Sequence, residues 1–165
     1  MFFPKGLVAL PIAITIALIS AYAMYQSILS MANVKKYESK AEKAAEWSNT
    51  ARDRLWDTRY TIGTGFLSCL VSLITAALYI LLVPAGSTGS SVLAAPLWTM
   101  WPAVLALGLR FGASRYMHKF WATKDKVPLV DQYNAAISQS MHVISLLDLL
   151  SAGWAVLAVL KALSL

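Results

Sequence analysis

Residues 137–160 read ISQSMHVISLLDLLSAGWAVLAVL, and Asp148 is the one side chain among them with a fixed charge. About 20 apolar residues in a helix are enough to cross the hydrocarbon core of a bilayer. The segment therefore predicts a membrane-spanning helix that carries a carboxylate near its middle. Because a charge at that depth is costly, such a residue usually faces the interior of a helix bundle and often carries function.

The composition of the whole chain favours the same class of protein. Hydrophobic residues make up 58% of the 165 positions and charged residues only 13%, about half of the charged fraction of roughly 25% that soluble domains carry. We expect one integral membrane domain that is all-α, a multi-pass bundle of four antiparallel transmembrane helices. The approximate spans are 7–29, 61–83, 92–112 and 137–160.

The first apolar run has two interpretations. A single Lys5 followed by an apolar stretch and Ala21-Tyr22-Ala23 has the form of a secretory signal, which would be cleaved after residues 1–23 and leave three spans. However, the run has no charge between Lys5 and Lys35, which is far longer than the apolar part of a signal peptide. We favour an uncleaved first transmembrane helix.

Residues 34–59 form the one substantial polar segment. They are rich in Ala, Lys, Glu and Arg, which are good helix formers, and Ser48-Asn49-Thr50 interrupts the pattern. We expect a basic helical hairpin between the first and second spans. It is either a docking surface for a partner or a solvated hairpin against the membrane face, with Trp47 and Trp56 at headgroup depth. The second interpretation is favoured because the apolar stripe is weak.

The positions of Lys and Arg indicate an orientation. Lys5 precedes the first run, seven basic residues separate the first two runs, none separates the next two, five precede the last, and Lys161 follows it. Twelve of the fourteen thus lie on one side of a four-span chain. By the positive-inside rule, both Lys/Arg-rich loops are cytoplasmic, or on the equivalent inner side, and both termini lie opposite. The sequence indicates no particular organelle.

Small residues mark two helix faces. Thr64, Ser68, Ser72 and Ala76 recur every four residues in the second run, which predicts a face for close helix contact. A hydroxyl-lined polar pathway is the less favoured alternative. In the third run, Gly108 and Gly112 form a second, weakly specific packing pair.

Several classes of function lack support in the sequence. It contains no HExxH, GxSxG, P-loop or GxGxxG motif. One cysteine and two histidines make a metal site improbable, and no cofactor is indicated. The net charge of +6 resides in the loops between apolar runs, and no motif for nucleic acid is present.

The candidate site consists of Asp148, His142 and Arg110. Asp148 shares a helix face with Ser145 and Ala152, and His142 lies beside that face toward the inner side. Arg110 is expected near the inner end of the third helix, at a depth similar to His142 and within partial reach of Asp148. Asp148 would then form an ion pair with Arg110, donate a hydrogen bond as a neutral carboxyl to Ser68 or Ser72, or transfer protons in catalysis. The alternatives are structural: Asp148 fixes helix register, His142 lies at the interface, and Arg110 snorkels to the headgroups.

Three functions fit these observations. The favoured one is an accessory, assembly or scaffold subunit that acts through helix packing, with a membrane protein partner or as a homo-oligomer. The second is a membrane-embedded enzyme that isomerises, cyclises or oxidises a lipophilic small molecule, with Asp148, His142 and Arg110 as catalytic residues. The third is a transporter or channel subunit, which would require oligomerisation. Beyond the lipid bilayer itself, no partner is specified, and nucleic acid is not among those expected.

Overall fold

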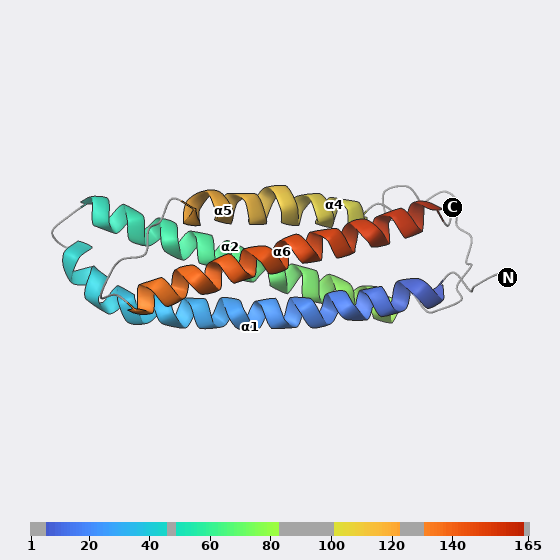
Figure 1. Ribbon diagram of the computed structural model, residues 1–165, viewed down its shortest axis with the longest axis horizontal. Coiled ribbons are helices and arrows are strands. Elements are labelled where there is room, and N and C mark those ends of the chain that lie inside the picture. The colour runs from blue at the N-terminus through green and yellow to red at the C-terminus, as the bar shows by residue number, and fades with distance from the viewer. Residues whose placement is uncertain (1–5, 46–48, 83–100, 123–130, 164–165) are drawn as a thin grey trace.

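The computed structural model describes residues 6–45, 49–82, 101–122 and 131–163, and over these ranges the chain is helical except for a turn at Ala122 (Figure 1). Three segments follow one another without a break and are called the third helix below: α4 (Trp101–Leu107), η1 (Gly108–Ser114) and α5 (Arg115–Trp121). The chain therefore has four helices in these ranges. The elements in order are α1 (Gly6–Ala45), α2 (Asn49–Leu82), α4 (Trp101–Leu107), η1 (Gly108–Ser114), α5 (Arg115–Trp121) and α6 (Asp131–Leu163).

Three of the helices are long and apolar enough to cross a membrane. The candidate spans are Val8–Lys36, Trp56–Leu81 and Asn134–Leu160, with mean hydropathies of 1.9, 2.0 and 2.2. The helices that contain them have 40, 34 and 33 residues, so each exceeds the roughly 30 Å thickness of a hydrocarbon core at 1.5 Å per residue. The expectation of an all-α protein is confirmed for the described residues, and three of the helices are long and apolar enough to span a membrane.

The third helix differs from its expected position at 92–112. Residues 92–100 lie outside the described residues, and the helix continues past position 112 to Trp121. It begins at Trp101, so Pro102 falls in its first turn, where a proline needs no hydrogen-bond donor. Its three segments of seven residues each give a length of about 31 Å at 1.5 Å per residue.

The four helices lie lengthwise beside one another (Figure 1). α1 packs on α2 and α6, and the third helix packs on α6 and, less extensively, on α2. α1 begins and α6 ends at one end of the bundle, whereas α1 ends and α2 begins at the other (Figure 1). The chain therefore runs up, down, up and down along the bundle.

Hydroxyl groups connect the helices inside the bundle. The Ser20 and Ser72 hydroxyls are 2.9 Å apart, and the indole N–H of Trp154 donates to the same Ser72 oxygen at 2.9 Å. Ser30 and Ser140 are joined in the same way at 3.0 Å. All five side chains are buried, so these bonds satisfy polar groups that would otherwise be stranded in an apolar interior.

The small-residue face of the second run contacts neighbouring helices of the same chain. Ser72 and Ala76 are buried, as are Gly65 and Cys69 alongside. A Cβ added at Gly65 would lie 2.8 Å from the Met117 Cε atom, so glycine permits the close approach of α2 to the third helix. In contrast, Gly108 and Gly112 are exposed with open space around them, and packing at that pair stays a prediction.

Candidate functional site

Asp148 lies close to the middle of the candidate span Asn134–Leu160 and faces the third helix. One turn further along α6, the buried Ser151 hydroxyl donates to the Ala106 carbonyl oxygen at 2.8 Å, which fixes the two helices side by side at this level. The Asp148 side chain is 38% exposed. It therefore lies in the seam between two helices at the surface of the bundle and not in its core.

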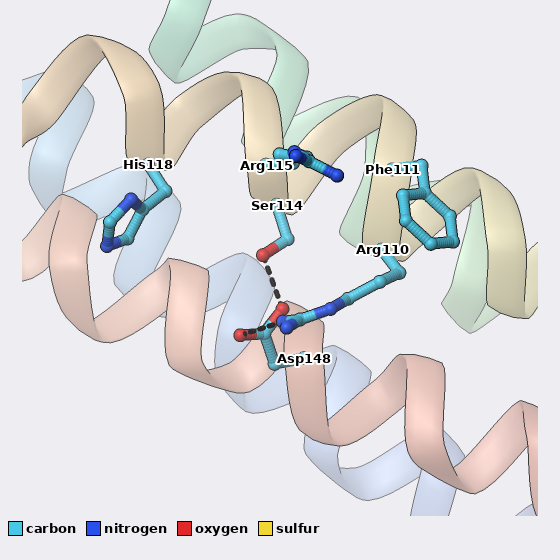
Figure 2. A pocket seen from close by; sticks show the side chains of 6 residues that line it. All are labelled: Arg110, Phe111, Ser114, Arg115, His118 and Asp148. Atoms are coloured by element: carbon cyan, nitrogen blue, oxygen red, sulfur yellow. Dashed lines mark hydrogen bonds and ion pairs between the residues drawn. The ribbon is translucent and has the colours of Figure 1, made fainter.

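Both oxygens of the Asp148 carboxylate are engaged by the third helix (Figure 2). Arg110 Nη1 lies 2.5 Å from Oδ2 in an ion pair. The buried Ser114 hydroxyl donates a short hydrogen bond to Oδ1. Charge-assisted hydrogen bonds are stronger than neutral ones, so this contact joins α6 to the third helix near the middle of the bundle. We call it the Asp148 clip.

The Arg110 and Ser114 side chains belong to a π-helical segment, η1. Its wider turn is seen at its end, where the Arg115 N–H donates to the Arg110 carbonyl, five residues back. Such segments are rare and frequently occur at functional sites. Arg110 and Ser114 are about one turn apart on this segment, and both reach the same carboxylate.

The Asp148 clip forms one wall of a groove of about 430 Å³ between the third helix and α6. Arg110, Phe111, Arg115 and His118 are exposed, so the groove opens on the outer surface of the bundle (Figure 2). Its lining consists of Arg110, Phe111, Ser114, Arg115, His118 and Asp148.

The structure brings together two of the three expected site residues. Arg110 pairs directly with Asp148, one of the interactions considered, but it lies level with that carboxylate and not with His142. His142 packs edge-on against Tyr22 of α1, with ring centroids 6.0 Å apart, and it does not line the groove. Ser72, another expected partner of Asp148, is bonded to Ser20 and Trp154 instead.

Sequence reasoning did not assign Ser114, Arg115 and His118 to the site. The expected third span ended at 112, so Arg115 and His118 were counted as loop residues. One signal could have found them, because Arg110, Ser114 and His118 recur at intervals of four and share one face if the helix continues.

The groove differs from metal sites in its donor set. Within the described residues, no group of three His, Cys, Asp or Glu side chains is placed to hold a metal ion. The Asp148 carboxylate is already bound by Arg110 and Ser114.

No family model, curated protein or solved structure matches this chain.

Proposed function

We propose that the protein is a four-span membrane protein that holds a lipophilic small molecule in the groove beside Asp148. The observation that carries this proposal is the groove itself, about 430 Å³ in volume and lined by polar side chains from two helices. Small-molecule sites in proteins commonly measure about 300–1,000 Å³ and combine an apolar environment with a few placed polar groups. Here five of the six lining side chains are polar, so the apolar part of a ligand would contact Phe111 and the surrounding bilayer.

The fourth span in this proposal is the third helix. Its length of about 31 Å matches the hydrocarbon core of a bilayer. Two ring contacts support this assignment: Trp101 packs against Trp154 with ring centroids 5.1 Å apart, and Tyr116 packs against Tyr60 at 6.1 Å. Trp154 and Tyr60 both belong to candidate spans, so the third helix runs alongside apolar helices over its whole length.

The orientation is proposed on the same basis. The seven basic residues of the α1–α2 hairpin lie at one end of the bundle, and Lys5 and Lys161 flank the apolar runs that begin and end at the other. Arg110, Arg115 and Lys119 now belong to the third helix and no longer count as loop residues. The larger number of Lys and Arg residues outside the helices' apolar parts at the hairpin end still favours that end as the inner side.

A groove at this depth takes its ligand from the bilayer. Phe111 lines the groove and is exposed, and Val104 and Leu107 on the third helix and Leu149 on α6 are further exposed apolar side chains of the same two helices. A lipophilic molecule could therefore enter sideways between these side chains. An enzyme acting on that molecule is the narrower form of this proposal, and there His118 is a better candidate for proton transfer than the occupied Asp148.

The test is purification from native membranes in a gentle detergent, followed by mass analysis of co-eluting small molecules. We expect about one lipophilic molecule per chain in the wild type and its loss in His118→Trp, which fills the groove. Lys119→Trp is the matched control, because Lys119 is an exposed basic neighbour outside the lining. A wild type without a bound molecule, or equal retention in both variants, would contradict the proposal.

A scaffold or accessory role is the second candidate function, favoured by the length of the α1–α2 hairpin. α1 continues to Ala45 and α2 begins at Asn49, and residues 35–59, between the first two apolar runs, contain seven Lys or Arg and five Asp or Glu. The two helices thus extend more than a turn beyond the apolar region, where a soluble partner surface could bind. Replacing the polar side chains of the hairpin by alanine should then remove a co-purifying protein while leaving any bound small molecule in place.

A further inference from the structure

We infer that the groove recognises the acidic group of its ligand, a single carboxylate or phosphate at the end of an apolar chain. This inference rests on the proposed function and narrows it from any lipophilic molecule to an anionic amphiphile. The residues that would bind the acidic group are Arg115 and His118, while Phe111 contacts the adjoining apolar part.

The charges that line the groove do not cancel. Arg110 and Asp148 neutralise each other in the Asp148 clip. Among the described residues, Arg115 and His118 have no ion-pair or hydrogen-bonding side-chain partner. The lining therefore holds one uncompensated guanidinium and one imidazole, and no second carboxylate.

The position of Arg115 and His118 along the third helix explains why the excess positive charge in the groove favours an anionic ligand. Arg115 is one residue beyond the π-helical segment that holds Asp148, and His118 is about one turn beyond Ser114. On the four-span arrangement, both lie within the length of a membrane-crossing helix. A cation in that environment is costly unless it has a partner or reaches water, so an anion in the groove would stabilise it.

Arg115 and His118 offer N–H donors on either side of Ser114 (Figure 2). Arg110, Arg115 and His118 follow one another along the third helix above Asp148 (Figure 2). A guanidinium binds carboxylate or phosphate oxygens through two parallel N–H donors, and a nearby imidazole supplies a further donor. Phe111 is 58% exposed at the groove, which leaves its ring available to the tail of the ligand. A fully water-soluble anion has no reason to enter at this depth.

The experiment measures binding to the full chain in a neutral detergent by native mass spectrometry. The probes are oleate, oleyl alcohol with the same tail but no charge, and inorganic phosphate with charge but no tail. We expect oleate to bind at least about tenfold more tightly than oleyl alcohol, since a charge-assisted contact contributes roughly that factor. Inorganic phosphate should not bind at the same concentrations.

Variants assign the effect to the two side chains. Arg115→Gln combined with His118→Gln should weaken oleate binding about tenfold or more, while Arg115→Lys retains most of it. Lys119→Gln is the matched control, since it removes a neighbouring exposed charge outside the lining. None of these changes touches the Asp148 clip, and an unchanged melting temperature verifies that each variant is folded.

Three results would overturn the inference. Equal binding of oleate and oleyl alcohol would leave the proposed function intact and remove the acidic group from it. Tight binding of inorganic phosphate would indicate a soluble anion. A stoichiometric membrane protein that is lost from Arg115→Gln/His118→Gln, with no small molecule bound to the wild type, would mean that an acidic partner helix occupies the groove, and the proposed function would fail with the inference.

Discussion

Asp148 and Arg110 differ in how each would tolerate the loss of the other. Without Asp148, the long Arg110 side chain, already 55% exposed, can turn toward the headgroups and water. Without Arg110, the short carboxylate stays in the seam between two helices with only the Ser114 hydroxyl. In the four-span arrangement this surface faces lipid, where removing one member of an ion pair is more destabilising than removing both.

We therefore predict an order of stability for the three leucine variants. Arg110→Leu should melt at the lowest temperature and Asp148→Leu at a higher one. The double variant should melt near the wild type, because no uncompensated charge is left. Thermal unfolding in detergent, arranged as a double-mutant cycle, measures this order. Additive effects of the two single changes would show that the ion pair does not join the helices.

Two buried tryptophans allow the contribution of one interhelical hydrogen bond to be isolated. The Trp154 N–H donates to Ser72, whereas the Trp121 N–H has no acceptor among the described residues. Both side chains are almost fully buried, so replacement by phenylalanine removes a similar volume at each position.

Trp154→Phe should therefore be more destabilising than Trp121→Phe by about 1 kcal/mol, the typical net contribution of one hydrogen bond. For a chain of this size, that corresponds to about 2–4 °C in melting temperature. Thermal unfolding of the two variants side by side is the measurement. Equal losses would mean that the bond to Ser72 adds nothing beyond packing.

Asp148 could be recognised from the sequence alone, but its partner could not. A lone carboxylate in an apolar run identified Asp148, because no other residue in that run has a fixed charge. Its partner was one of several possibilities, since Ser68, Ser72 and Arg110 all lay on other helices whose rotation the sequence does not specify. His142 contacts Tyr22 of α1, a contact that depends on which helices are neighbours.

Among the elements, the close approach of α2 and the third helix depends on Gly65. A methyl group there would meet the buried Met117 side chain at 2.8–2.9 Å, whereas a methyl group at Gly63 meets nothing within 4 Å. Both replacements by alanine gain the same helix propensity, so their difference reports the contact alone.

Gly65→Ala should consequently be less stable than Gly63→Ala by about 1–3 kcal/mol, the usual range for an overpacked core. The flexible Met117 side chain favours the lower end of that range. Melting temperatures of the two purified variants provide the comparison. Indistinguishable values would mean that the third helix lies further from α2 than the structure places it.

The third helix is also the element whose limits the sequence misjudged. Arg115 and His118 looked like the start of a loop because each polar residue lowers the apolar character of a span. In the folded chain, Asp148 on α6 compensates Arg110, and the helix continues to Trp121. The hydropathy of one segment does not take account of a compensating charge on another helix. The four-residue spacing of Arg110, Ser114 and His118 was the one sign in the sequence that the helix continues.

On the scale of the whole molecule, apolar runs and alternating loop charge were sufficient to predict an all-helical membrane protein. These features follow from the cost of placing polar groups in hydrocarbon, which acts on each segment separately. The groove arises from two segments, η1 with α5 and the middle of α6, that lie more than 30 residues apart in the chain. Their meeting depends on helix rotation and on the π-helical turn, neither of which the apolar pattern specifies.

The depth of the groove depends on the third helix crossing the membrane, and the positions of the two chain ends test this most directly. Different epitope tags on the N- and C-termini, with a third in the α1–α2 hairpin, can be located by antibody access and protease protection in sealed vesicles. Four spans predict that both terminal tags are retained and lie on one side, opposite the hairpin tag. Terminal tags on opposite sides of the membrane would contradict the four-span bundle and, with it, a groove inside the bilayer.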